Sequence, residues 1–166
     1  MHELTRLQVL PPVVRWILQG GPAVRAAAGE GFGVILPEQP CRFCTANDRS
    51  ALWLAPDEHL LLGPPGEANA MEAGLVAALS GMPHSLVDVS HRQVGISVSG
   101  RDASALLNTG CPLDLDPAEF PVGMCTRTLL AKADIVLWRP DAEEFRLETG
   151  RSFLSYVMRW LREAEA

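Results

Sequence analysis

The sequence predicts an α+β protein with one or more largely antiparallel sheets and about three packed helices. Short apolar runs joined by tight turns indicate hairpins and meanders. Three segments with helical spacing are interleaved with them, and no strand, glycine turn and helix follow one another as in a doubly wound parallel sheet. At 166 residues the chain has the size of one ordinary domain. We expect residues 33–166 to form a single α+β domain, with two sub-domains meeting near residues 90–100 as the alternative.

The first part of the chain, residues 1–32, predicts a loosely structured N-terminal arm, because prolines and glycines at 11–12 and 20–22 interrupt its short apolar pieces. The glycine-rich Gly29–Gly33 is expected to be a flexible approach to the next element. Gly33–Leu36 is a short apolar strand candidate that Pro37 closes.

The clearest hairpin joins Ala51–Ala55 to His59–Leu62 through a turn led by Pro56. Glu67–Leu79 follows with apolar residues at helical spacing, and a glycine and a proline at 81 and 83 end that helix.

Ser85–Val89 and Val94–Val98 predict two strands, of which the second alternates apolar and small polar residues. Arg101–Leu107 predicts a helix that ends near Gly110. Residues 111–121 are expected to be a loop with at most one helical turn.

Three further strands are predicted at Thr126–Ala131, Asp134–Trp138 and Phe145–Thr149. Arg151–Glu163 then predicts an amphipathic helix with one apolar face.

Composition excludes several partners. The net charge of −6 and the pI near 5.2 argue against nucleic acid, which is bound by clustered Lys and Arg. No run approaches the roughly 18 apolar residues of a membrane span, and no signal peptide is recognisable. The four cysteines, without a secretory signal, indicate reduced thiols, so we expect a cytoplasmic protein with no membrane partner.

Cys41-x-x-Cys44 has the spacing of a zinc or redox pair. Cys111 and Cys125 are isolated from it and from each other, and the motif does not open a helix. We interpret the pair as two incidental thiols; a small thiol redox protein is the weakest alternative, because it requires a depressed thiolate pKa.

Asp88, Ser90 and His91 resemble parts of a nucleophilic triad, and His59 or His84 could supply a base. In a strand, however, residues 88 and 90 point to one face and residue 91 to the other, and no Gly-x-Ser-x-Gly turn presents the serine. A structural, hydrogen-bonded aspartate at a strand end is the preferred interpretation. No catalytic, cofactor-binding or metal residue is therefore assigned.

The nucleotide-binding glycine motifs are absent from the sequence, which argues against a self-contained dinucleotide or triphosphate site. The four tryptophans are best explained by packing, although tryptophan is also enriched at interface centres. Trp16, in the expected arm, is the preferred interface candidate.

Several segments, taken in order, resemble the gamma-subunit family of heterotetrameric sarcosine oxidases. They are Arg49, Ala51–Leu61, Val87–Arg92, Leu106–Leu115, Phe120–Gly123, Arg127–Thr128, Val136–Arg139, Phe145 and Arg151–Tyr156. Asp88-x-Ser90 and Gly100-x-Asp102-Ala103 are more distantly similar to the folate-binding aminomethyltransferases, represented by the T protein of the glycine cleavage system.

The resemblance implies a fold like the aminomethyltransferase folate-binding domain and a place in an alpha, beta, gamma, delta complex. That complex oxidatively demethylates sarcosine to glycine, with tetrahydrofolate as one-carbon acceptor and release of hydrogen peroxide. FAD, FMN, NAD, zinc and tetrahydrofolate are expected on the partner subunits. The chain itself is expected to be non-catalytic.

The sequence departs from the family pattern at His59, where an aromatic residue is expected, and at Cys41-x-x-Cys44. The segment before Gly33 matches poorly. A stand-alone folate-binding or aminomethyl-transfer module remains the alternative, although the chain is short for a complete folate pocket.

Overall fold

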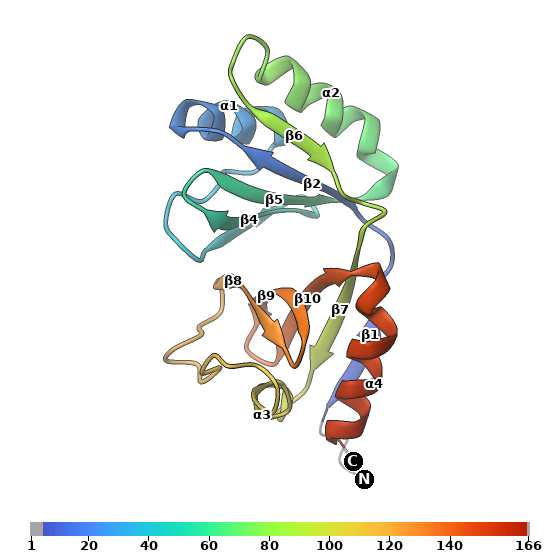
Figure 1. Cartoon of the computed structure of the whole chain (residues 1–166). Helices are drawn as coiled ribbons and strands as arrows, with labels where there is room; N and C mark the ends of the chain where they lie inside the picture. Colours follow the sequence, from blue (N-terminus) through green and yellow to red (C-terminus); the bar gives the residue numbers. More distant parts are fainter. Residues whose placement is uncertain (1–4, 166) are drawn as a thin grey trace. The chain divides into compact units, whose positions relative to one another are not determined.

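The computed structural model describes residues 5–165, in which the chain forms ten strands and four α-helices (Figure 1). It divides into two compact units. One is continuous in sequence and spans Pro12–Ser90. The other joins the segment up to Pro11 to the chain from His91 onward. The α+β class predicted from the sequence is confirmed.

The continuous unit contains a five-stranded antiparallel sheet in the order β3-β4-β5-β2-β6. Its strands are β2 (Val14–Gln19), β3 (Phe43–Ala46), β4 (Arg49–Ala55), β5 (Glu58–Gly63) and β6 (Ser85–Asp88). The β4–β5 pair is the predicted hairpin. Its neighbour, β3, was not predicted, and a two-residue turn at Asn47-Asp48 joins it to β4 with φ of 51° and 61°. Asparagine and aspartate tolerate this left-handed conformation better than most residues.

Two helices cover one face of this sheet, α1 (Pro22–Phe32) and α2 (Ala68–Ala78), the latter preceded by the 3₁₀ turn η1 (Pro65–Glu67) (Figure 1). They pack on the apolar side chains of the sheet and come very close to each other. A Cβ added at Gly31 would lie 2.5 Å from the carbonyl oxygen of Gly74. Small residues therefore permit a helix contact that larger side chains would block.

The prediction of a loose arm over residues 1–32 is wrong for the described part, which begins at residue 5. Here β1 (Arg6–Val9), β2 and α1 account for most of the segment. Pro22 stands at the first turn of α1, where a missing N–H costs nothing, so a residue that suggested a break instead starts a helix. The glycine-rich Gly29–Gly33 forms the end of that helix, and Gly33 adopts the left-handed conformation of a helix cap at φ 78°.

Arg49 joins three elements of the continuous unit. Its Nη1 donates to the carbonyl oxygen of Phe32 at the end of α1 at 2.7 Å, and its Nη2 lies 2.6 Å from the Glu67 carboxylate in η1. The guanidinium also stacks on the Phe32 ring at 5.8 Å. One side chain of β4 thus satisfies a terminal helix carbonyl and ties α1 and the turn before α2 to the sheet.

The second unit contains another five-stranded antiparallel sheet, in the order β1-β7-β10-β9-β8. Its later strands are β7 (Gln93–Ser99), β8 (Cys125–Leu130), β9 (Ala133–Asp141) and β10 (Glu144–Gly150). Its helices are α3 (Ala103–Asn108) and α4 (Leu154–Glu165), the latter preceded by the 3₁₀ turn η2 (Arg151–Phe153). The predicted strands and helices of this region are confirmed within a few residues at each end.

Residues 111–124 of this unit form the predicted loop. It contains the one helical turn allowed for it, because the Phe120 N–H donates to the Asp116 carbonyl at 2.8 Å. The buried Arg139 of β9 holds the loop in place. Its Nη1 donates to the carbonyl oxygens of Phe120 at 2.8 Å and Leu115 at 3.4 Å, and its Nη2 donates to that of Ala142 at 2.7 Å. The guanidinium also lies 4.7 Å from the centre of the Phe145 ring.

No helix among residues 5–165 combines the length and apolar character that a bilayer crossing requires.

Candidate functional site

Asp88 and Ser90 are both hydrogen-bonded to main chain. Asp88 Oδ1 accepts the Ser90 N–H at 2.8 Å, at the end of β6. Ser90 Oγ accepts the Arg15 N–H at 2.8 Å and donates to the Arg15 carbonyl at 3.4 Å, so it continues the pairing of β6 with β2. His91 is exposed. The hydrogen bond expected for Asp88 at a strand end is present, and its structural role stays a prediction.

His59 is a buried structural donor. It is only 2% exposed, and its Nε2 lies 2.8 Å from the carbonyl oxygen of Pro37. Because that carbonyl can only accept, the ring donates to it. Desolvation by burial lowers the pKa of His59, since it disfavours the charged imidazolium. A neutral imidazole therefore fastens the segment after α1 to β5.

The second histidine considered as a base, His84, is exposed, and its Nδ1 lies 2.8 Å from the Met82 carbonyl oxygen. It sits in the turn between α2 and β6. Like His59, it is engaged with the main chain of its own neighbourhood.

The cysteines are free thiols. Cys41 is half-buried and has a φ of 58°, in the turn that leads into β3, while Cys44 on β3 packs against the core beneath the helices. Cys111 is buried, with its Sγ 3.8 Å from Thr128 Oγ1, and Cys125 is buried as well. Within residues 5–165 no group of three or more His, Cys, Asp and Glu side chains is placed to hold a metal ion.

The choice of Trp16 as interface candidate is wrong. Trp16 is 3% exposed and belongs to the core of the continuous unit, because the segment around it forms β2 instead of a loose arm.

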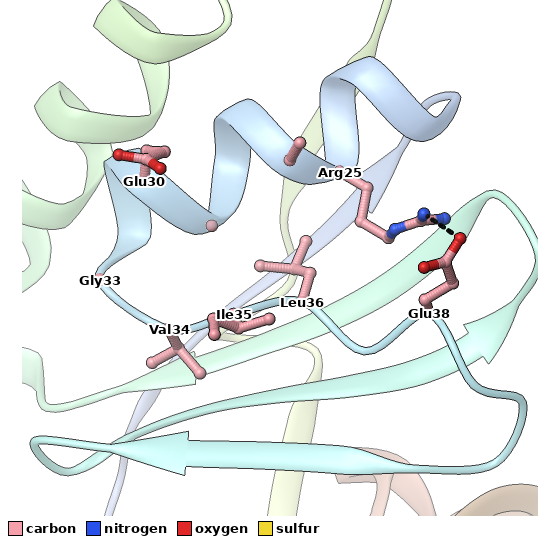
Figure 2. Close-up of a pocket in the computed structure, with 9 residues that line it drawn as sticks. Arg25, Glu30, Gly33, Val34, Ile35, Leu36 and Glu38 are labelled. Carbon is pink, nitrogen blue, oxygen red and sulfur yellow. Dashed lines mark hydrogen bonds and ion pairs between the residues drawn. The ribbon is translucent and has the colours of Figure 1, made fainter.

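A surface cavity of about 640 Å³ lies beside α1 (Figure 2). One wall is the exposed side of α1, including Arg25 and Glu30, and the other is the segment from Gly33 to Glu38. Arg25 and Glu38 form an ion pair at 2.9 Å at one end. The cavity thus has apolar and main-chain walls with charges near its ends.

The same segment carries the most exposed large apolar side chain described. Ile35 is 81% exposed, whereas Val34 and Leu36 on either side are 3% and 4% exposed. The sequence marked Gly33–Leu36 as a strand, and this prediction is wrong, because the segment pairs with no neighbouring strand. The alternation of buried and exposed side chains that is typical of a strand is nevertheless present at residues 34–36.

The fold resembles that of a solved aminomethyltransferase. Aminomethyltransferase T of the glycine cleavage system from Bartonella henselae matches 95% of this chain with a TM-score of 0.72 at 16% identity, and the match covers 45% of that protein. At this identity the likeness shows the fold alone. The chain therefore has an α+β fold like that of this aminomethyltransferase.

Its family follows from closer matches. Residues 19–166 match the Sarcosine oxidase, gamma subunit family. A curated sarcosine oxidase subunit gamma from an Arthrobacter species is 35% identical over 145 residues, which cover 87% of this chain and 70% of the relative. A chain of the heterotetrameric sarcosine oxidase from Corynebacterium sp. U-96, solved with pyrrole 2-carboxylate, is 29% identical with a TM-score of 0.90. That match covers 96% of this chain and 83% of the solved one.

This chain belongs to the sarcosine oxidase gamma subunit family. The resemblance drawn from the ordered sequence segments is confirmed.

Proposed function

We propose that this chain is a non-catalytic gamma subunit of a heterotetrameric sarcosine oxidase and that it supports assembly of the complex. The observation that carries the proposal is family membership, together with a match over 96% of the chain to a chain of a heterotetrameric sarcosine oxidase. The complex would oxidatively demethylate sarcosine to glycine, with tetrahydrofolate accepting the one-carbon unit and hydrogen peroxide released.

The non-catalytic role is supported by how the chemically capable side chains are used. Asp88 accepts from a backbone N–H, Ser90 bonds to both backbone groups of Arg15, and His59 is buried against the Pro37 carbonyl. A nucleophile and its base need to lie within hydrogen-bond reach of each other. Here each side chain is occupied by main chain, which is what a structural role requires.

The partners and cofactors in the proposal come from the family. The alpha, beta and delta subunits would be the partners, and FAD, FMN, NAD, zinc and tetrahydrofolate would be held by those subunits. The chain's contribution would be a folded surface that docks on the larger subunits.

The test is co-purification of the tagged full-length chain from cells that express the other subunits, followed by mass analysis and flavin absorbance. Recovery of a flavin-bearing complex with sarcosine-dependent peroxide production supports the proposal. Recovery of the chain alone, with tight folate binding, would instead favour the stand-alone folate-binding or aminomethyl-transfer module.

The non-catalytic claim has its own test in the intact complex. Asp88→Asn keeps an acceptor oxygen for the Ser90 N–H but removes the charge, and His91→Ala is a matched change at an exposed position. Both variants should affect stability or assembly more than turnover. A large loss of turnover in a complex with unchanged subunit content would show that the claim is wrong.

A further inference from the structure

The segment after α1 has the sequence of a strand but no strand partner. Gly33–Leu36 contains the β-favouring residues valine and isoleucine and is followed by a proline, a pattern typical of a short strand. Within residues 5–165, no hydrogen bond joins the main chain of Val34, Ile35 or Leu36 to another residue. The main-chain donors and acceptors of these three residues therefore have no hydrogen-bond partner in the described chain, as along the edge of a sheet, although the Val34 carbonyl and the Leu36 N–H lie on the side of α1.

The segment is nevertheless fixed in place. Val34 and Leu36 are buried in the core of the continuous unit. At its start the Gly33 N–H donates to the Gly29 carbonyl at 2.9 Å, and at its end His59 holds the Pro37 carbonyl. A surface held at both ends loses little conformational entropy when a partner binds it.

Because its neighbours are buried, Ile35 is held with its side chain exposed to solvent. Its 81% exposure between two buried neighbours reproduces the alternation of a half-buried strand. Figure 2 shows the segment running beside α1 along the cavity of about 640 Å³. An exposed isoleucine next to a cavity of this size gives an apolar centre for docking.

The charges around the cavity indicate the charge of the partner that would bind there. Arg25 and Glu38 neutralise each other in an ion pair, whereas Glu30, exposed on the α1 wall, has no ion-pair partner in the described part of the chain. One uncompensated carboxylate therefore remains at the Gly33 end. It favours a basic group on the occupant.

We infer that Gly33–Leu36 is a docking strand for another subunit of the oxidase. The occupant is an extended segment of that subunit, which pairs with this main chain, covers Ile35 with apolar side chains and places an arginine or lysine beside Glu30. The inference rests on the proposed function, because it takes the partner to be a subunit of the same complex. Addition of a strand to an exposed edge is a common mode of peptide recognition.

The first test compares two variants of the tagged full-length chain, co-expressed with the other subunits. Ile35→Asp places a charge at the proposed contact, and Val76→Asp places one at another exposed apolar position, on α2, where Val76 is 58% exposed. Ile35→Asp should lower the yield of co-purified oxidase subunits at least about tenfold, since burial of one isoleucine corresponds to a factor of that size or more. Val76→Asp should leave the yield unchanged, and Glu30→Lys should lower it by a smaller factor.

The second test does not depend on a variant. Hydrogen exchange of the wild-type complex and of the isolated chain should show the amides of Val34, Ile35 and Leu36 protected only in the complex. Equal exchange in both states, or a full yield of oxidase subunits with Ile35→Asp, would overturn the docking strand while leaving the proposed function intact.

Two other outcomes would also reject the inference. A wild-type chain that recovers no oxidase subunit would remove the proposed function, and the docking strand with it. An isolated wild-type chain that is a dimer, and that Ile35→Asp converts to a monomer, would assign this surface to pairing between copies.

Discussion

Residues 33–40 in the continuous unit and residues 111–124 in the other unit are both irregular segments, and in each a buried basic side chain on a nearby strand bonds to their carbonyls. Arg139 donates to two carbonyls of its segment and to a third in the β9–β10 turn, and it stacks on Phe145. His59 makes one such bond, to Pro37. Arginine stays charged at any ordinary pH, whereas histidine titrates. The hydrogen bond to Pro37 is compatible with either charge state of His59, but burial disfavours the charged one, so protonation of this side chain costs free energy in the continuous unit.

The largest loss of stability is expected from Arg139→Met. The carbonyls of the buried residues Leu115 and Phe120 would lose their donor, and each unsatisfied buried group costs roughly 1–3 kcal/mol. Release of the desolvation cost of the charge offsets part of this, so the free energy of unfolding should fall by about 2–4 kcal/mol. Urea denaturation of the variant measures the loss.

Arg146→Met is the control for this change. Arg146 on β10 stacks on Trp138 and pairs with Glu144, but its side chain is 36% exposed. Its removal should cost less than about 1 kcal/mol. Equal losses for the two variants would mean that the bonds of Arg139 to the Leu115 and Phe120 carbonyls are not what holds the loop.

The two units also differ in how their helices pack. In one unit α4 contacts its sheet through large side chains, whereas in the continuous unit α1 and α2 contact each other through glycines. Gly31→Ala would place a methyl group 2.5 Å from the Gly74 carbonyl oxygen and 2.7 Å from the Ala78 Cβ. Overpacking of this kind costs about 1–3 kcal/mol, partly offset by the better helix propensity of alanine. Thermal unfolding should show a lower midpoint for Gly31→Ala than for Gly66→Ala, since an added Cβ at Gly66 meets nothing within 4 Å. Equal midpoints would mean that the helices can move apart at little cost.

The burial of His59 predicts a pH dependence of the free energy of unfolding. Burial lowers the pKa of His59 in the folded state, so below the unfolded value of 6.5 the unfolded chain binds the proton more readily. The contribution is complete above pH 6.5 and is lost progressively as the pH falls toward the folded pKa. His59→Gln, which keeps a donor but does not titrate, should flatten the stability profile between pH 7 and 5 relative to wild type. Parallel profiles for the two proteins would contradict this origin of the pH dependence.

The smallest change in the free energy of unfolding is expected at two tight turns, one in each unit. Asn47 and Asp48 occupy left-handed conformations that suit them, whereas Ala131, between β8 and β9, has a φ of 51°. Ala131→Gly should raise the free energy of unfolding by up to about 1 kcal/mol, because the steric penalty of a Cβ in this conformation exceeds the entropy that glycine adds to the unfolded chain. Asn47→Gly should change it less, and denaturant midpoints of the two variants give the comparison.

Much of the fold could be predicted from the sequence where apolar periodicity was strong. The β4–β5 hairpin, the meander of β8, β9 and β10, and α4 all carry clear patterns. β3 was missed because its exposed and half-buried positions do not alternate, and α1 because the residues that make its close contact with α2 are small. Alanines and glycines pack well but leave little periodic signal.

The candidate site could be predicted only in part. The hydrogen bond of Asp88 was expected from its position at a strand end, and it is present. Ile35 was included in a predicted strand, but its exposure depends on Val34 and Leu36 turning into the core, which no local pattern states. The holding roles of His59 and Arg139 depend on the carbonyls of Pro37 and Phe120, which lie 22 and 19 residues away, and such pairings arise only from the tertiary fold.

The strand β1 belongs to a unit whose remaining residues begin at His91, and it pairs Arg6 with Ser99 and Val9 with Ile96 on β7. During synthesis, the whole of the intervening unit Pro12–Ser90 emerges from the ribosome before β7 does. That unit can therefore fold before β1 can pair with β7. Contacts between such distant parts of a chain form slowly. The last unit to mature therefore contains a strand made before the intervening unit, and a hydrogen-exchange pulse during refolding should find the β1 amides among the latest to be protected.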